Sequence, residues 1–163
     1  MYGWRENRCF SRVIIINFIW LFLIINFFKE MISKEIIRIA SNTSNVGLNN
    51  KYSHKISLKN KLCGDKITLE LIVFKKKILS MKYETESCVY CEASASLLSK
   101  KVKNFNIKTI KKEFRNLKNI SRNKECKIPK KFTDFKKLFN SDNFNRLNCI
   151  FLPFDAVIKA LKL

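Results

Sequence analysis

Residues 66–84 read KITLELIVFKKKILSMKYE, and this stretch decides the fold. Polar and apolar residues alternate over Lys66–Phe74 and again over Ile78–Glu84, which is typical of strands with one buried face. Lys75–Lys77 is a polar break between them, so the two strands are expected to form an antiparallel hairpin. The inner face of this hairpin is predicted to consist of Ile67, Leu69, Leu71, Val73, Leu79, Met81 and Tyr83.

Further elements extend outward from the hairpin. A weaker alternation over Ser53–Leu58 predicts a third strand, and Asn60–Asp65 predicts the turn that joins it to the hairpin. Cys88–Val102 is rich in Ala and Ser and predicts a helix that can lie close against the sheet. More helices are expected at Thr109–Asn119, at Thr133–Asn140 and from near Cys149 onward, with a basic linker over residues 121–131. The expected architecture is α+β: a small antiparallel three-stranded sheet with helices packed on one face.

The last predicted helix carries one continuous apolar stripe. Pro153 lies within this helix and has no backbone N–H, so it is compatible with the helix only in the first turn. The helix is therefore expected to begin near Cys149, which places that cysteine at the helix N-terminus. The stripe consists of Ile150, Phe154, Val157, Ile158 and Leu161.

The composition limits the class of protein. The chain has 163 residues, of which 47% are hydrophobic, with only 3 Gly and 2 Pro. These values indicate one globular domain and exclude disordered and collagen-like chains. The sequence contains no G-x-S-x-G segment and no glycine-rich phosphate loop, which argues against serine hydrolases and nucleotide-binding enzymes.

The net charge of +20 raises the question of a nucleic-acid or membrane partner. Only 7 of the 33 basic residues are Arg, which is the residue preferred for forked contacts to phosphates and bases. We therefore expect no nucleic-acid partner and interpret the charge as a solvated lysine surface. Electrostatic steering toward an acidic partner is the alternative.

The N-terminal segment differs from the rest of the chain. Val13–Phe28 is an almost unbroken apolar run that follows Arg5, Arg8 and Arg12, a pattern that resembles a signal anchor. The run has 16 residues, whereas a spanning helix needs about 20. Three alternatives stay open: translation begins at Met31, the segment is a membrane anchor, or it is a buried helix.

We therefore expect an apolar N-terminal extension over residues 1–30 and one folded domain over residues 31–163. The predicted location is cytoplasmic. Membrane contact is expected only if residues 1–30 are part of the protein.

Six cysteines, at positions 9, 63, 88, 91, 126 and 149, are too few for a disulfide scaffold and favour a metal site or a reactive thiol. Cys63 falls in the predicted turn. Cys88 and Cys149 fall at helix N-termini, where unpaired N–H groups are expected to lower a thiol pKa. With Asp65, these residues could converge on one rim of the sheet. Thiolates plus a carboxylate suit Zn²⁺ or an iron–sulfur cluster, although the spacing alone leaves other sites open.

The remaining candidate residues have simpler interpretations. Cys91 forms a C-x-x-C with Cys88, but the preceding hairpin is not the β-α-β context of a redox motif, so we expect a packing role. Cys126, in the basic linker, is expected to be incidental, and Cys9 to lie outside the functional region. His54, the only histidine, is expected at a surface strand position.

Three segments resemble motifs of the iron–sulfur cluster assembly scaffold family, which includes IscU, SufU and the N-terminal domain of NifU. Residues 62–71, LCGDKITLEL, resemble the family's P-x-C-G-D segment. Residues 87–98, SCVYCEASASLL, resemble its G-C-x-x-x-x-A-S-A-S helix start, and residues 146–157, RLNCIFLPFDAV, resemble its closing R-x-x-C-x-x-L-P segment. The three motifs occur in the family's order, and the resemblance covers residues 31–163.

This resemblance implies a function as well as a SufE/NifU-like fold. It implies that Cys63, Asp65, Cys88 and Cys149 hold a [2Fe–2S] cluster or iron, with Zn²⁺ as the alternative occupant. It implies a SufS-like cysteine desulfurase as the sulfur donor and apo iron–sulfur proteins as acceptors. The chain would then be a scaffold or sulfur carrier, not an enzyme. We expect Cys63 to take the sulfur first, because it lies on the mobile turn.

Some residues depart from the family pattern. Asn148 stands where the IscU branch has a His before the last Cys, and Ser87 replaces the Gly before the second. The stretch between the second and third cysteines is also longer, as in the SufU-like branch, for which bound Zn²⁺ and sulfur transfer are implied. Two other functions remain as alternatives: a structural zinc protein without sulfur traffic, and a basic, membrane-tethered nucleic-acid binder.

Overall fold

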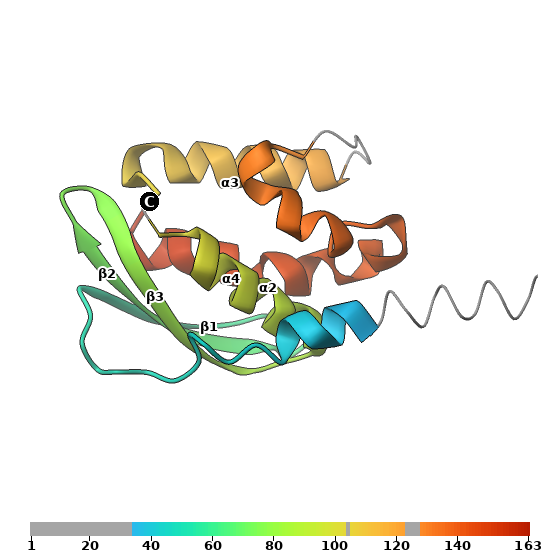
Figure 1. The fold of residues 1–163 in the computed structure, drawn as a ribbon, viewed down its shortest axis with the longest axis horizontal. Coiled ribbons are helices and arrows are strands. Elements are labelled where there is room, and N and C mark those ends of the chain that lie inside the picture. The colour runs from blue at the N-terminus through green and yellow to red at the C-terminus, as the bar shows by residue number, and fades with distance from the viewer. Residues whose placement is uncertain (1–33, 104, 123–127) are drawn as a thin grey trace, which may run out of the picture. The chain divides into compact units, whose positions relative to one another are not determined.

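A three-stranded antiparallel sheet in the order β1-β2-β3 forms one layer of the fold (Figure 1). The strands are β1 (His54–Lys59), β2 (Lys66–Phe74) and β3 (Lys77–Glu86). The computed structural model describes residues 34–103, 105–122 and 128–163, so the predicted extension over residues 1–30, Cys9 and Cys126 lie outside the described residues. The sheet confirms the strands and the turn predicted from alternation.

The helices lie on one face of this sheet (Figure 1), which confirms the expected α+β architecture. The α-helices that follow the sheet in the chain are α2 (Val89–Lys101), α3 (Ile107–Arg122) and α4 (Leu147–Ala160). The 3-10 helices η1 (Lys130–Lys137) and η2 (Ser141–Arg146) connect α3 to α4. Residues 133–140 were expected to form one short helix, whereas η1 ends at Lys137 and η2 was not expected. In the part of the chain that the structure describes, no helix has the length and hydropathy needed to cross a bilayer.

The inner face of the sheet follows the predicted alternation with one exception. Ile67, Leu69, Leu71, Met81 and Tyr83 are each at most 1% exposed. The exception comes from a register shift, because Ile72 pairs with Ser80 while the next residue, Val73, pairs with Ile78. The residue between these partners, Leu79, is therefore the extra residue of a β-bulge and is 39% exposed, and Ile78 is buried in its place.

The α2–α4 contact brings the predicted site residues to one end of the sheet. The Ser94 hydroxyl on α2 donates a hydrogen bond of 2.6 Å to the Ile150 carbonyl on α4. The small residues Ala93, Ser94, Ala95 and Ser96 are buried, which permits this close approach. Helix α2 was expected to lie close against the sheet, and it packs mainly against α4. The N-termini of the two helices are neighbours, because Asp65 forms hydrogen bonds with both Cys88 and Cys149.

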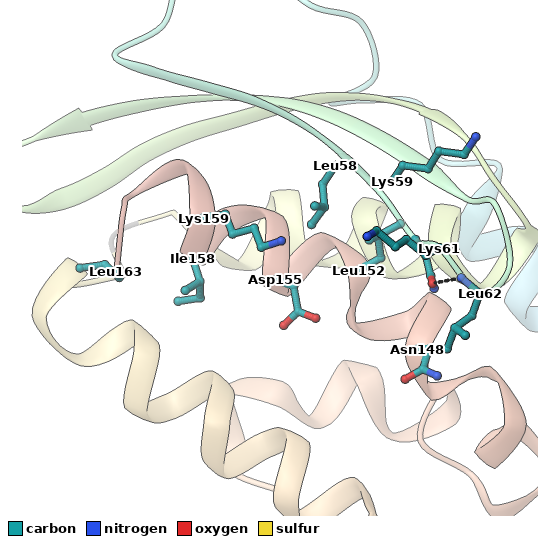
Figure 2. Close-up of a pocket in the computed structure, with 11 residues that line it drawn as sticks. Leu58, Lys59, Lys61, Leu62, Asn148, Leu152, Asp155, Ile158, Lys159 and Leu163 are labelled. Carbon is teal, nitrogen blue, oxygen red and sulfur yellow. Dashed lines mark hydrogen bonds between the residues drawn. The ribbon is translucent and has the colours of Figure 1, made fainter.

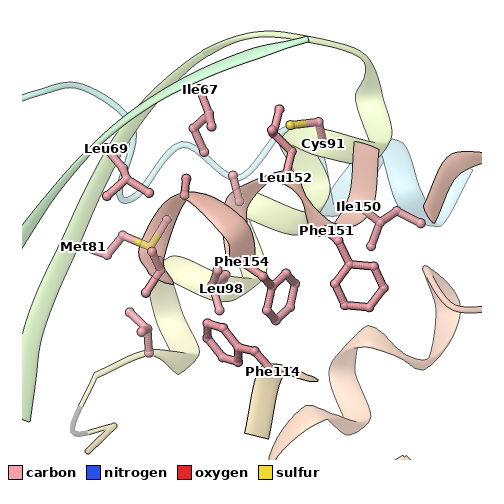
Figure 3. Packing of buried hydrophobic residues seen from close by; sticks show 14 of the residues in the cluster. Ile67, Leu69, Met81, Cys91, Leu98, Phe114, Ile150, Phe151, Leu152 and Phe154 are labelled. Atoms are coloured by element: carbon pink, nitrogen blue, oxygen red, sulfur yellow. The ribbon is translucent and has the colours of Figure 1, made fainter. Parts of the chain in front are cut away.

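Helix α4 begins two residues earlier than expected. It starts at Leu147, so Pro153 lies in the second turn and not the first. Since proline has no N–H, the Cys149 carbonyl receives no helical hydrogen bond from residue 153. Dense packing compensates for this loss, because Phe154 makes an edge contact with Phe114 at 4.8 Å between ring centroids (Figure 3). The Phe135 ring also lies 5.2 Å from the Phe154 ring, in a tilted arrangement.

Candidate functional site

The turn that carries Cys63 and Asp65 is organised by Asn60. The Asn60 side-chain oxygen accepts the Leu62 N–H at 2.9 Å, and its carbonyl accepts the Gly64 N–H at 2.9 Å. The Asn60 N–H in turn donates to the Asp65 carbonyl at 2.7 Å. Gly64 has φ of +77°, a left-handed conformation that glycine adopts without a steric penalty. The turn therefore presents Cys63 and Asp65 together at the start of β2.

Asp65 connects this turn to the N-terminus of α2. One carboxylate oxygen accepts the backbone N–H of Cys88 at 3.0 Å, and the other accepts the Cys88 thiol at 3.2 Å. Cys88 is the N-cap residue of α2, with φ of −71° and ψ of 161°. The acidic side chain lies at the positive end of the helix, where a negative charge is favoured.

Cys149 approaches the same carboxylate from α4. Its Sγ lies 3.4 Å from the Cys63 Sγ. One ligand atom from each of Cys63, Asp65 and Cys149 lies within 4.8 Å of the other two. Cys88 joins this group through Asp65. The structure therefore brings together all four predicted site residues, although two of them are 86 positions apart in the sequence.

The carboxylate and the thiols influence each other's ionisation. Desolvation alone would raise the pKa of Asp65, but hydrogen bonds from Cys88, Cys149 and Cys63 hold it below its usual value. Burial raises the pKa of Cys149 far above that of a free thiol, and the hydrogen bonds to Cys63 and Asp65 raise it further. The expectation that a helix N-terminus lowers this thiol's pKa is therefore wrong for Cys149. Desolvation and the nearby carboxylate outweigh the helix.

The donor set fits a thiophilic cation. The group offers three sulfur atoms and a carboxylate oxygen, which match the ligands used by four-coordinate zinc and by iron–sulfur clusters. A bound cation would replace the thiol protons, so binding would release protons.

The other candidates lie outside this group. Cys91 is fully buried in the core, and desolvation raises its pKa to about 12. His54 lies on β1, with its Nδ1 3.0 Å from the Ser53 hydroxyl. Asn148 is exposed on α4, next in sequence to Cys149.

Sequence reasoning missed a groove that begins at Leu62 and Asn148, which are next in sequence to Cys63 and Cys149. Its volume is about 440 Å³, and its walls come from the end of β1, the turn and the outer side of α4 (Figure 2). Leu62, which precedes Cys63, lines it and is 81% exposed. An apolar residue in an otherwise polar turn was the one available signal.

Comparisons with known proteins agree with this fold. The model of the NifU-like N-terminal domain matches residues 31–138. A NifU-like protein (N-terminal) from Brucella abortus is 22% identical, with a TM-score of 0.68 over 79% of this chain and 90% of that one. A SufU protein from Fervidobacterium islandicum is 21% identical, with a TM-score of 0.66 over 80% of this chain and 97% of that one. No curated protein matches.

These structural neighbours share the fold, and the family model covers Cys63, Asp65 and Cys88, while Cys149 reaches the same site from outside the matched range. The chain belongs to the NifU-like N-terminal domain family.

Proposed function

We propose that this chain is an iron–sulfur cluster assembly scaffold that accepts persulfide sulfur from a cysteine desulfurase. The convergence of three thiols on the Asp65 carboxylate carries the proposal. Family membership supports it, as does the likeness to a protein described as a cluster assembly scaffold for the SUF system. In this proposal residues 31–163 form the scaffold domain and residues 1–30 an apolar extension.

The cluster is the cargo of such a protein. Cys63, Asp65, Cys88 and Cys149 would hold a [2Fe–2S] cluster or its iron during assembly. A carboxylate oxygen is a harder and weaker ligand for this cargo than a thiolate, so Asp65 would keep the cluster releasable to apo acceptor proteins. The chain then acts as a scaffold rather than an enzyme, and in the cytoplasm.

Cys63 is the proposed entry point for sulfur. Its side chain is exposed, whereas Cys149 is buried and Cys88 is half-buried. Attack by a thiolate on a persulfide requires access to the incoming sulfur, and Cys63 offers the most. Each sulfane sulfur must then gain two electrons to become sulfide, so assembly also needs a reductant.

The experiment is a measurement of metal and acid-labile sulfide in the anaerobically purified full chain. Reconstitution would use iron, cysteine, dithiothreitol and a cysteine desulfurase. We expect stimulated sulfide production, a persulfide on Cys63, and a cluster that is lost in Cys63→Ser, Cys88→Ser and Cys149→Ser but kept in Cys91→Ala. Tightly bound zinc, with no stimulation and no persulfide, would instead indicate a structural zinc protein.

A further inference from the structure

The groove beside the thiols has a defined direction. Leu62 and Asn148 lie toward one end of it, and Leu163 lies toward the other (Figure 2). These first two residues are the chain neighbours of Cys63 and Cys149. A segment lying along the groove would therefore have one end beside the turn that carries the exposed Cys63 and beside the start of α4.

The walls of the groove combine apolar and basic side chains. Leu58, Leu62 and Ile158 supply apolar surface, while the exposed Lys61 and Lys159 supply positive charge. Neither lysine forms an ion pair within the described part of the chain.

One acidic side chain lines the groove, and it already forms an ion pair. Asp155 forms an ion pair with Lys118 at 3.1 Å. Its charge is therefore matched from α3, and the charge left to a ligand is that of the lysines. With a net charge of +20 over the whole chain, long-range attraction also favours an acidic partner.

We propose that this groove receives an acidic and partly apolar segment of the cysteine desulfurase, namely the segment that carries the persulfide. This inference rests on the proposed function. Carboxylates of the segment pair with Lys61 and Lys159, and an apolar side chain covers Leu62. The segment then ends with its persulfide beside Cys63.

Sulfur transfer from this position is a simple exchange. The Cys63 thiolate attacks the outer sulfur of the donor persulfide, and a new sulfur–sulfur bond forms on Cys63. The bond between that sulfur and the donor's Sγ breaks, and the donor leaves as a thiolate with the electron pair. The proton stays on the transferred sulfur, and no net oxidation occurs.

The test measures binding and transfer with the full chain and a purified cysteine desulfurase from the same organism. The variants are Lys61→Glu combined with Lys159→Glu, and Leu62→Asp. Lys112→Glu is the matched control, because Lys112 is exposed on α3 and does not line the groove. We expect the Kd to rise about tenfold or more in the groove variants. The binding of the double lysine variant should also depend less on salt concentration, and this variant should keep the zinc stoichiometry of wild type. Lys112→Glu should bind the desulfurase with the same Kd as wild type.

Three results would overturn the inference. If wild type accepts sulfur and the groove variants bind like Lys112→Glu, the groove is not the docking site, although the proposed function stands. If the groove variants slow sulfur transfer from cysteine persulfide, a small donor, as much as they slow transfer from the desulfurase, the groove holds small thiols instead. If wild type neither binds the desulfurase nor accepts sulfur, the proposed function fails and this inference fails with it.

Discussion

Asp65 contacts Cys88 through both of its carboxylate oxygens, one with the backbone N–H at 3.0 Å and one with the thiol at 3.2 Å. One side chain therefore orders the start of α2 and also faces the thiols. These two roles can be separated by substitution, because an amide can still accept the N–H but carries no charge.

We expect Asp65→Ala to make a reconstituted cluster longer-lived, because it removes the weakest ligand of the proposed site. The decay of the cluster's visible absorbance measures this. The same variant should lower the free energy of unfolding by about 1 kcal/mol, since the Cys88 N–H loses its acceptor.

Asp65→Asn is the control for the structural role. It should restore most of the lost stability, because its side-chain oxygen can accept the same N–H. An unchanged rate of cluster decay in Asp65→Ala would contradict the role of Asp65 in cluster release.

Alkylation should distinguish the described cysteines by rate. Cys63 is exposed and should react first with iodoacetamide, as read by mass spectrometry of peptides. Cys91 should react far more slowly than Cys63, because it is fully buried and burial raises its pKa to about 12, so little thiolate exists at neutral pH. In urea the two should react alike, and equal rates in the folded protein would rule out this prediction.

Much of the sheet could be predicted because alternation is a local property of the chain. The bulge at Leu79 could not, since Ile78 and Leu79 are adjacent apolar residues and the sequence does not reveal which of them faces the core. The start of α4 at Leu147 could not be predicted either, because Pro153 suggested a later start. The buried packing of Phe154 outweighs the preference of proline for the first turn of a helix.

The sequence could predict which residues make up the candidate site, but not their pKa values or the distances between them. Turn and helix-start positions placed Cys63, Cys88 and Cys149 at element ends. The elevated pKa of Cys149 could not be predicted, because it depends on burial and on a carboxylate contributed by a distant turn. The 3.4 Å approach of Cys63 to Cys149 likewise depends on tertiary packing.

The hairpin turn contains removable strain. Lys75 and Lys76 have φ of 46° and 63°, as a two-residue type I′ turn requires, although lysine disfavours this conformation. Replacing the pair by Asn-Gly should raise the free energy of unfolding in urea by about 1 kcal/mol. In contrast, Lys112→Gly within α3 should lower it by about as much, and no gain from Asn-Gly would refute the strain.

Glu70 should make stability depend on pH. Desolvation would raise the pKa of Glu70, but hydrogen bonds from Lys55 and from the Asn49 and Asn50 N–H groups hold it below 4.5. Because the folded state lowers this pKa, the stabilisation is present above pH 4.5 and is lost as the pH falls through the folded-state value.

Urea unfolding of wild type and Glu70→Gln at several pH values tests this sign. The stability difference between them should shrink below pH 4.5. Lys55→Gln, which removes the partner, should show a smaller pH dependence than wild type. A difference that stays constant from neutral pH to pH 3 would exclude the ion pair as its source.

Close packing of α2 on α4 should control the metal affinity of the site. Ser94 is fully buried, and its hydroxyl lies 2.6 Å from the Ile150 carbonyl. Ser94→Val adds bulk there, which costs about 1–3 kcal/mol of stability and moves the N-termini of the two helices apart. Ser94→Ala loses only the hydrogen bond, about 1 kcal/mol.

Zinc competition with a chromophoric chelator should show affinity reduced about tenfold in Ser94→Val and nearly unchanged in Ser94→Ala. Equal zinc affinities in two folded variants would show that this helix contact does not set the separation of Cys88 and Cys149.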